Sequence, residues 1–221
     1  MTRDRGRAKK IVGGIYSFAA HRLYEPIVVR RAFPLLGGDL NELVAEQGRE
    51  AVRVAAGRPI LDMPVGTAYF TSAVAQAHPG LVAGVDIAEG MVRESAALAR
   101  SRGLSNLVAL QADAHSLPFR DGAFGAILCT NGLQVIPGLR PAVRELARVL
   151  APGGTLFVSV VGLPLGAVLP SKTAEGLPTV LAARTKVADE MERAGLEVRE
   201  TRRRRLATLF EADKPLEERP R

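Results

Sequence analysis

The chain has 221 residues, 47% hydrophobic and 24% charged, which is enough to bury the core of one globular domain. Aromatic residues make up 5% and tryptophan is absent, which argues against a base-stacking platform for nucleic acid. The net charge of +7 is concentrated at the two ends, in basic residues up to Lys10 and in the run Arg202 to Arg205. Solvated surface charge is the commoner explanation of such clusters, although contact with nucleic acid or an anionic membrane surface is compatible with them.

Cysteine and hydropathy patterns bear on compartment and metal binding. Cys129 is the single cysteine, so no intrachain disulfide can form, and we expect a cytoplasmic protein. The apolar stretch from Ile11 to Ala20 is short and contains two glycines, unlike a signal peptide, and no run approaches the ~20 residues of a membrane span. One cysteine and three histidines show no ligand spacing, so we expect no metal site.

The first part of the chain is predicted to be helical and separate from the core. Residues 1–10 are predicted to be a disordered basic tail, and residues 11–57 a helical cap. The spacing of apolar residues predicts an amphipathic helix from Ile11 to Ala32, and Asp39 is a plausible N-cap for a second helix. Because both helices precede the first strand, we expect them to form a lid.

From residue 58 to 215 strand and helix patterns alternate, and residues 216–221 form a short tail. Strands are predicted at 60–63, 81–86, 107–110, 124–129 and 155–161. The last helix is predicted to end at Gly195, followed by a hairpin of Leu196–Thr201 and Leu206–Ala212. Repeated strand–helix units predict an α/β fold, a mostly parallel sheet with helices on both faces.

The turn after the first strand and the acid after the second predict a nucleoside pocket. In dinucleotide-binding units the ribose acid lies about 20 residues beyond the glycine turn, and Asp86 follows Gly66 by 20 residues. The turn has only Gly66 where a pyrophosphate cradle needs three glycines. A ligand with a ribose and no phosphate therefore suits it better, which favours S-adenosylmethionine over NAD or FAD.

Five stretches in a fixed order extend this pattern. They are Leu61 to Thr67, Val85 to Met91, Gln111 to Phe119, Asn131 to Pro137 and Arg148 to Gly154. Together they resemble class I S-adenosylmethionine-dependent methyltransferases, in particular the branch of ubiquinone and menaquinone C-methyltransferases. The resemblance runs from about residue 59 to 215 and implies a Rossmann-like, seven-stranded, mostly parallel sheet with an antiparallel last strand.

The resemblance also implies roles for individual residues. Asp62 would lie near the methionine part of S-adenosylmethionine, Asp86 would accept from the ribose hydroxyls, and Asp113 would accept from the adenine amino group. Asn131 would lie beside the sulfonium and the methyl acceptor. The other candidate cofactor contacts are Pro64, Gly66, Thr67, Ile87, Met91 and Ala114.

The chain departs from the family pattern at several positions. Ala68 stands where a second glycine is usual, and its methyl group is expected to crowd the carboxypropyl end of the cofactor. Pro64-Val65 replaces a glycine-cysteine pair, and Phe124-Gly125 stands where a Phe-Asp pair is common. Gln134 stands where many relatives have histidine, which argues against an imidazole mechanism there.

Methyl transfer from a sulfonium is an in-line displacement that asks the protein mainly for orientation and desolvation. The candidate catalytic residues are His21 and Tyr24 in the cap, and Asn131 and Gln134 after the fourth strand. For the histidines and tyrosines, a structural role is the favoured interpretation. The acids at strand ends are different, because packing explains them poorly.

The leading hypothesis is a methyltransferase acting on a carbon or oxygen of a small, largely apolar acceptor, such as a quinol, phenol or polyketide. The protein is expected to be a monomer or a homodimer. The basic ends suggest an RNA methyltransferase as one alternative. Asn131-Gly132-Leu133-Gln134 stands in place of the motif for nucleobase amines, so nucleic acid is not the expected acceptor. Ala68 and Pro64-Val65 suggest a second alternative, a cyclase or assembly partner that does not methylate.

Overall fold

The computed structural model describes residues 40–133, 136–161, 183–204 and 207–216. The predicted basic tail, the predicted helix from Ile11, and the candidates His21, Tyr24 and Gln134 lie outside the described residues. The strands are β1 (Ile60–Asp62), β2 (Val82–Asp86), β3 (Leu107–Gln111), β4 (Phe124–Thr130), β5 (Leu150–Val161), β6 (Glu197–Arg204) and β7 (Ala207–Asp213). The helices are α3 (Leu40–Ala55), α4 (Thr71–Ala77), α5 (Glu89–Ser101), α6 (Leu139–Val149) and α7 (Ala183–Arg193).

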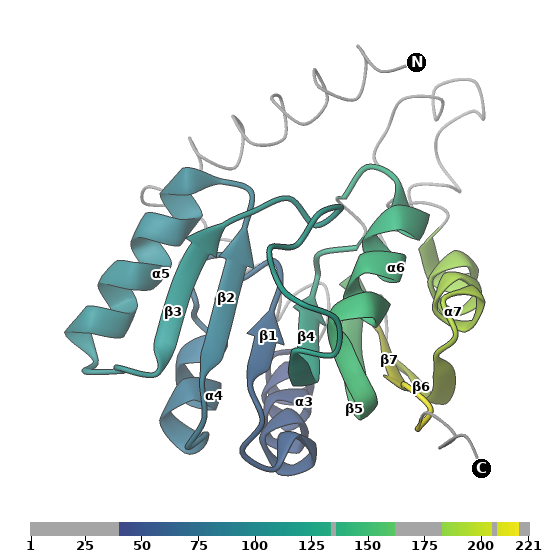
Figure 1. The fold of residues 1–221 in the computed structure, drawn as a ribbon, viewed down its shortest axis with the longest axis horizontal. Helices are drawn as coiled ribbons and strands as arrows, with labels where there is room; N and C mark the ends of the chain where they lie inside the picture. The colour runs from purple at the N-terminus through teal and green to yellow at the C-terminus, as the bar shows by residue number, and fades with distance from the viewer. Residues whose placement is uncertain (1–39, 134–135, 162–182, 205–206, 217–221) are drawn as a thin grey trace.

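In the described part of the chain the strands form one sheet of seven, in the order β3-β2-β1-β4-β5-β7-β6 (Figure 1). β1 to β5 are parallel, whereas β7 runs antiparallel between β5 and β6. The predicted α/β class with an antiparallel last strand is therefore confirmed. The strand order changes direction at β1 and β4, and open α/β sheets bind ligands at the carboxyl ends of strands beside such a switch point.

Two apolar layers cover the two faces of the sheet. On one face Ala126 and Leu128 of β4 pack with α3, α4 and α5. On the other face Ile127 and Cys129 pack with α6 and α7. Figure 1 shows α3 and α4 behind the sheet and α6 in front of it. This alternation within a continuous apolar strand is typical of a parallel sheet buried on both sides.

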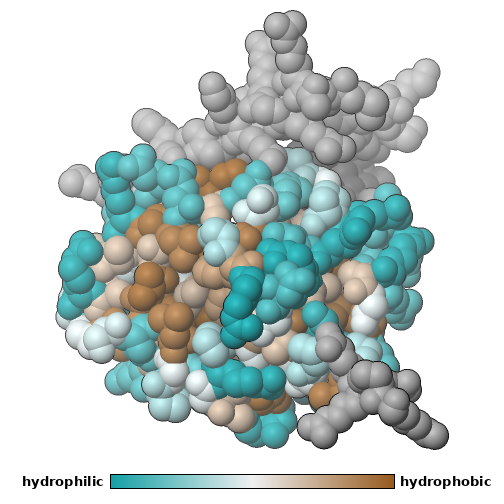
Figure 2. Space-filling model, in the orientation of Figure 1, coloured by the Kyte–Doolittle hydropathy of each residue, from teal (hydrophilic) through white to brown (hydrophobic). Residues whose placement is uncertain are grey.

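The α6 face is less completely covered at the β3 edge. Figure 2 shows apolar residues gathered on the visible face over β2 and β3. Val108 of β3 is 48% exposed, although its neighbour Leu107 is buried. The connection from β3 to β4, residues 112–123, contains no helix, so a loop takes the place of the helix that follows β1 and β2.

The helix predicted after Asp39 is present as α3, but its predicted place over the site is wrong. Leu40, Ala51 and Ala55 are fully buried, and α3 contacts β1, β4, β5 and α4. Gly48 lets α3 approach α4 closely, because a Cβ there would lie 3.0 Å from Val74 Cγ2. The buried residues of α3 form an apolar stripe along the helix, and this stripe stabilises the helix when it packs against the sheet. Residues 40–55 therefore belong to the core layer and are not part of a lid.

Most predicted element ends agree with the structure to within a few residues. Gly195 ends α7 with φ of +81°, and the Leu196 amide donates to the Met191 carbonyl at 3.0 Å, as in a Schellman cap. The main difference is β5, predicted from Thr155 and observed from Leu150. Gly153, with φ of +69°, keeps the chain paired, because its amide donates to the Lys214 carbonyl at 2.8 Å.

The turn after β1 is held between its neighbouring strands. The Met63 amide donates to the Leu128 carbonyl at 3.0 Å, and the Val65 amide donates to the Val85 carbonyl at 2.8 Å. Two glycines leave room for the large residues of this turn. A Cβ at Gly84 would lie 2.6 Å from Val65 Cγ2, and one at Gly132 would lie 2.1 Å from Pro64 Cδ. The Pro64-Val65 departure is therefore accommodated by packing against glycines of β2 and of the loop after β4.

This packing predicts non-additive stabilities. Gly84→Ala should lower the free energy of unfolding by about 1–3 kcal/mol, because the added methyl group overlaps Val65. In the double variant with Val65→Ala the overlap is gone, so the loss should be smaller than the sum of the two single losses. Urea unfolding of wild type, both single variants and the double variant measures this. Additivity within about 0.5 kcal/mol would contradict the proposed contact.

Candidate functional site

The carboxyl ends of β1, β2 and β4 meet at one edge of the sheet, where the predicted polar residues gather. Asp62 ends β1, Asp86 ends β2, and Asn131 follows β4 directly. Leu128 of β4 pairs with Asp62, and Gln111 at the end of β3 pairs with Asp86. Parallel strands in register bring their last residues to the same edge, so side chains up to 69 positions apart in the sequence become neighbours.

Asp86 ties the turn after β1 to the end of β2. Its Oδ2 accepts from the Gly66 amide at 3.1 Å, and its Oδ1 accepts from the Ala88 amide at 2.9 Å. The residue is only 7% exposed, and this burial raises the pKa of its carboxyl group, while the backbone amides of Ala88, Gly66 and Ile87 oppose the rise. Each carboxylate oxygen retains capacity for a further donor, which suits a pair of hydroxyl groups.

Asp62 is more deeply buried than Asp86 and less completely paired. Its Oδ2 accepts from the Thr71 hydroxyl at 2.5 Å, whereas its Oδ1 has no hydrogen-bond partner within the described residues. Burial raises the pKa of the carboxyl group to about 7, the Thr71 hydroxyl lowers it, and the charge of Asp86 raises it further. An unpaired, buried carboxylate oxygen at a ligand-binding edge is costly unless a ligand donates to it.

Ile87 and Met91 differ in how they face this edge. Ile87 is 37% exposed, although it is a large apolar residue directly after Asp86. Met91, in the first turn of α5, is 1% exposed and packs beneath the loop. Exposed apolar surface next to a buried carboxylate is suited to a flat ring attached to a polar sugar. Ile87 thus has surface to offer a ligand, whereas Met91 supports the loop.

Asp113 follows β3 and belongs to a compact turn. The Ser116 amide donates to the Asp113 carbonyl at 2.9 Å, closing this turn around the buried Ala114. Asp113 Oδ1 accepts from the His115 amide at 3.0 Å, and the same oxygen lies 2.7 Å from His115 Nδ1. His115 thus contacts Asp113 through both its backbone amide and its ring.

Two residues of α6, not predicted from the sequence as part of the site, hold the loop that carries Asp113. Glu145 accepts from the Leu117 amide at 2.7 Å. Arg148 donates to the Phe119 carbonyl at 2.8 Å and to the Leu117 carbonyl at 3.1 Å, and it pairs with Glu145 at 2.7 Å. Arg148 stands in the Arg148 to Gly154 stretch that carries the resemblance, so the stretch itself was the available signal.

Asn131 has an unusual environment for an amide side chain. Its backbone is left-handed, with φ of +52°, and its backbone N–H group donates to the Ser159 carbonyl at 2.8 Å. Both polar atoms of its side chain are buried and have no hydrogen-bond partner within the described residues. Left-handed backbone is tolerated by asparagine more readily than by most residues, and an unpaired buried amide is rare in the absence of a function.

The expected crowding by Ala68 does not agree with its position. Ala68 is left-handed, with φ of +59°, where glycine is favoured. It is fully buried, however, and belongs to the apolar cluster that includes Val65 and Val74. Its methyl group therefore has no surface toward the edge of the sheet. The other turn candidates, Pro64 and Thr67, are half-buried there.

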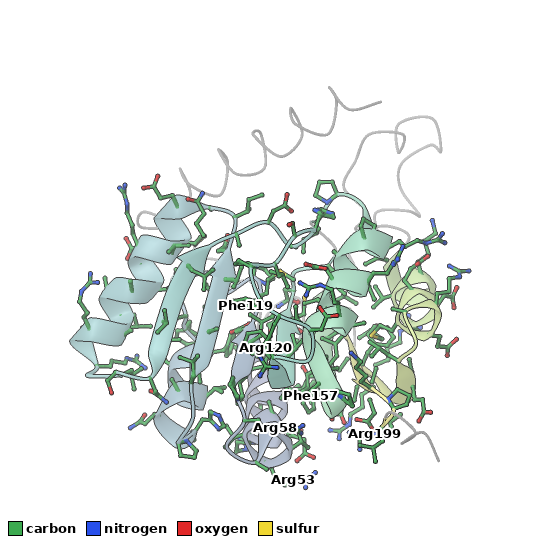
Figure 3. All side chains as sticks on the ribbon, in the orientation of Figure 1. Arg53, Arg58, Phe119, Arg120, Phe157 and Arg199 are labelled. Atoms are coloured by element: carbon green, nitrogen blue, oxygen red, sulfur yellow. The ribbon has the colours of Figure 1, made fainter. Side chains whose placement is uncertain are left out.

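A cavity of about 530 Å³ lies away from this edge, between α3 and the β6–β7 hairpin. Arg202 pairs there with Glu46 at 3.2 Å, and Arg199 pairs with Asp213 at 2.5 Å. Figure 3 places Arg53 and Arg199 at the lower end of the view, whereas the arrowheads of β2 and β3 in Figure 1 point to the upper end. None of the predicted cofactor contacts lines this cavity. Its lining residues are Leu43, Glu46, Gln47, Arg49, Glu50, Arg53, Arg199, Arg202, Leu209 and Glu211.

The described residues contain neither a metal-binding cluster nor a membrane-spanning helix. No group of three or more His, Cys, Asp or Glu side chains among those residues is arranged to hold a metal ion. Over that part of the chain, no helix has both the length and the apolar character to cross a membrane. The sole cysteine, Cys129, is fully buried, and burial raises the pKa of its thiol.

Comparison with known proteins agrees with this geometry. Residues 61–158 match the model of a family described as a methyltransferase domain. A demethylmenaquinone methyltransferase of Thermus thermophilus is 40% identical over 114 residues, which are 50% of this chain and 51% of that protein. Another, from Geobacillus stearothermophilus, is 34% identical over 105 residues, 47% of this chain and 45% of that protein. The chain thus spans about half the length of these curated relatives.

Solved structures share the fold over most of the chain. The structure of the cyclase SpnF matches with a TM-score of 0.68 at 23% identity. The match covers 78% of this chain and 81% of SpnF. A geranyl diphosphate methyltransferase in complex with SAM matches with a TM-score of 0.66 at 15% identity, over 80% of this chain and 88% of that methyltransferase. At such identities the likeness concerns the fold alone. The chain is thus similar to methyltransferases in sequence over residues 61–158 and in fold over most of its length.

Proposed function

We propose that this protein transfers a methyl group from S-adenosylmethionine to a carbon or oxygen of a small, largely apolar acceptor. The observation that carries the proposal is the convergence of Asp62, Asp86 and Asp113 on the carboxyl edge of β1, β2 and β3. Three acids at one edge of the sheet are poorly explained by packing. S-adenosylmethionine has three groups that can donate to them, the ribose hydroxyls, the adenine amino group and the methionine ammonium group.

The cofactor candidates divide into three groups along this edge. Asp86 would accept from the ribose hydroxyls, since its two oxygens each carry a spare lone pair beside Gly66 and Ala88. Ile87 would pack on the adenine, and Asp113 with the Ala114 amide would contact its amino edge. At the other end, Asp62 Oδ1 and the turn of Pro64, Gly66 and Thr67 would hold the methionine part. Met91 supports the adenine loop from beneath.

S-adenosylmethionine supplies an electrophilic methyl group on a sulfonium, and the residues of the chain supply orientation and exclusion of water. Asn131 is placed to hold the reacting groups, because both polar atoms of its side chain are buried and unpaired among the described residues. Cys129, two residues before Asn131, stays a thiol because burial disfavours its thiolate. His21, Tyr24 and Gln134 remain candidates for orienting or deprotonating the acceptor.

The relatives support an acceptor of the quinol type. The curated relatives are named demethylmenaquinone methyltransferases, and a quinol carries hydroxyl groups that ionise readily. An acceptor of this kind asks for no strong protein base, which agrees with glutamine at Gln134. Because quinols with apolar tails reside in membranes, the basic residues up to Lys10 would serve peripheral membrane contact. The protein would act as a monomer or a homodimer.

One specific observation favours a second candidate function. The cyclase SpnF is among the structures that share the fold, so the same architecture exists in a protein named for a reaction other than methyl transfer. The RNA methyltransferase alternative is less well supported, because Arg199 and Arg202 in the basic hairpin are each paired with an acid. Fold analogy alone does not separate these functions, so the reaction product must.

Product analysis provides the separating experiment. Wild-type protein is incubated with S-adenosylmethionine and either quinols, phenols and polyketide-like compounds or total RNA, and the products are analysed by mass spectrometry. A gain of about 14 Da on a small apolar compound, with none on RNA, is expected, since one CH₂ unit is added. Cofactor binding without any methylated product would favour the non-methylating alternative.

Binding of the cofactor product S-adenosylhomocysteine tests the role of Asp86. Asp86→Asn should weaken binding about 10- to 100-fold in isothermal titration, because charge-assisted hydrogen bonds to the ribose are lost. Asp189→Asn on the exposed side of α7 is the matched control and should leave affinity unchanged. Equal affinity of wild type and Asp86→Asn, with both proteins folded, would remove Asp86 from the site.

Asp62 predicts a pH dependence of binding. Its carboxyl has a pKa raised to about 7, so it is largely protonated below that pH and ionised above it. The ammonium group of S-adenosylhomocysteine is attracted only by the ionised form, so affinity should rise as pH increases from 6 to 8. Asp62→Asn should flatten this profile. Thr71→Val removes the hydrogen bond that lowers the pKa, so it should move the midpoint to higher pH. A wild-type profile as flat as that of Asp62→Asn would disprove the assignment.

A further inference from the structure

Asn131 is held between the end of β5 and the turn after β1. Its backbone N–H group donates to the Ser159 carbonyl of β5 at 2.8 Å. The next residue, Gly132, lies against the turn, because a Cβ there would be 2.1 Å from Pro64 Cδ. The chain passes between these two contacts through Asn131 with a left-handed φ of +52°. The position of this residue is therefore fixed by its backbone, without help from its side chain.

The carboxamide of Asn131 is buried without partners. Neither its Oδ1 nor its Nδ2 has a hydrogen-bond partner within the described residues. A buried amide in this state has given up its hydrogen bonds to water and replaced none of them, which lowers stability. Asn106 is different, because its Nδ2 donates to three backbone carbonyls. These are the carbonyls of Ala75 at 2.9 Å, His78 at 2.8 Å and Gly80 at 3.0 Å. The fold thus explains the side chain of Asn106 and leaves that of Asn131 unexplained.

The order of the strands places Asn131 on the acceptor side of the proposed cofactor site. Asp113 follows β3, Asp86 ends β2 and Asp62 ends β1, so the proposed contacts run from adenine through ribose to methionine across these strands. β4 is the next strand of the sheet, and Asn131 follows it directly. Methyl transfer requires the acceptor beside the methionine end, in line with the bond that breaks.

The two polar atoms of the carboxamide need different partners. Oδ1 accepts hydrogen bonds, whereas Nδ2 carries two hydrogens and can only donate. A sulfonium is a cation, so it is no partner for the N–H groups of Nδ2. An oxygen of the acceptor supplies the missing partner, and a phenolate oxygen does so best, because hydrogen bonds to charged oxygens are the stronger ones. A carboxamide has no proton to take up in this pH range, so it binds such an oxygen without acting as its base.

We propose that Asn131 donates from Nδ2 to the oxygen of a quinol-type acceptor and thereby directs the methyl group to the adjacent ring carbon. This inference rests on the proposed function and deepens it, by naming the atom that is methylated and the residue that selects it. A phenolate is nucleophilic both at oxygen and at the ring carbon beside it. An N–H group on the oxygen stabilises the negative charge there, which weakens the oxygen as a nucleophile and leaves the carbon free to react.

The reaction balances without a further reagent. The acceptor hydroxyl first gives its proton to water. Two electrons of the ring then form the new carbon–carbon bond while the carbon–sulfur bond breaks, and the electron pair of the broken bond stays on sulfur in the thioether product. The methylated ring carbon finally loses its hydrogen as a proton, and the oxygen regains a proton. The acceptor thus gains one methyl group, and one proton is released.

Stability without any ligand tests the unpaired carboxamide. Asn131→Gly removes both buried polar atoms and relieves the left-handed backbone, so its midpoint of urea unfolding should equal or exceed that of wild type. Asn106→Gly is the matched control, and its midpoint should fall clearly, because three hydrogen bonds are lost. A midpoint lowered as much in Asn131→Gly as in Asn106→Gly would assign the carboxamide a structural role and overturn the inference.

Product analysis tests the direction of transfer. Naphthoquinol, kept reduced under nitrogen, is incubated with S-adenosylmethionine and each protein, and chromatography with mass spectrometry separates the ring-methylated product from the methyl ether. Wild type should give mainly the ring-methylated product. Asn131→Asp keeps the size of the side chain but cannot donate. In Asn131→Asp and Asn131→Gly the ratio of ether to ring-methylated product should rise at least about tenfold, since a hydrogen bond to a charged oxygen is lost. Asn106→Gly should keep the wild-type ratio.

The outcomes distinguish this inference from the proposed function. Wild type that binds no S-adenosylhomocysteine in isothermal titration would overturn the proposed function. Wild type that binds it but leaves naphthoquinol unchanged would overturn the quinol-type acceptor, and this inference with it. Three results would overturn the role of Asn131 alone. They are a wild type that makes mainly the ether, a ratio unchanged in both Asn131 variants, and loss of both products to the same extent.

Discussion

The hydrogen bond from the Gly66 amide to the Asp86 carboxylate joins the turn after β1 to the end of β2, and the rest of the site depends on it. Because the amide is fixed by Val65, which is itself bonded to Val85, the carboxylate faces the edge of the sheet in one orientation. Its burial raises the free energy of the ion, and the backbone amides of Ala88, Gly66 and Ile87 offset part of this cost. The same amides preorganise the carboxylate before any ligand arrives.

Large residues in the turn are compatible with this geometry because neighbouring positions are glycines, which leave space for them. Val65 lies over Gly84, and Pro64 lies against Gly132. Ala68 keeps a left-handed backbone, and its methyl group is buried among apolar residues of the helical face. The departures from the family pattern are thus compensated by neighbours, which is a physical reason not to interpret them as loss of cofactor binding.

Loops at the same edge are held from α6. Glu145 and Arg148 fix the loop between β3 and β4, where no helix is present, and His115 reaches from that loop to Gly138. A loop fixed by charge-assisted hydrogen bonds at several backbone groups presents Asp113 with little freedom. The site therefore combines a rigid strand edge with a loop made rigid by one helix, an arrangement that favours orientation of a bound cofactor over chemical participation by the protein.

The local sequence determined the strand and helix order, the antiparallel hairpin and the three acids, because period, turn residues and strand-end acids are all encoded within short windows. Tertiary structure decided the place of α3 on the sheet, the burial of the Ala68 methyl group and the links from Thr71, Glu145 and Arg148. Those features depend on which residues meet across the sheet and between loops. Such contacts follow from packing and register, which no single stretch of the chain contains.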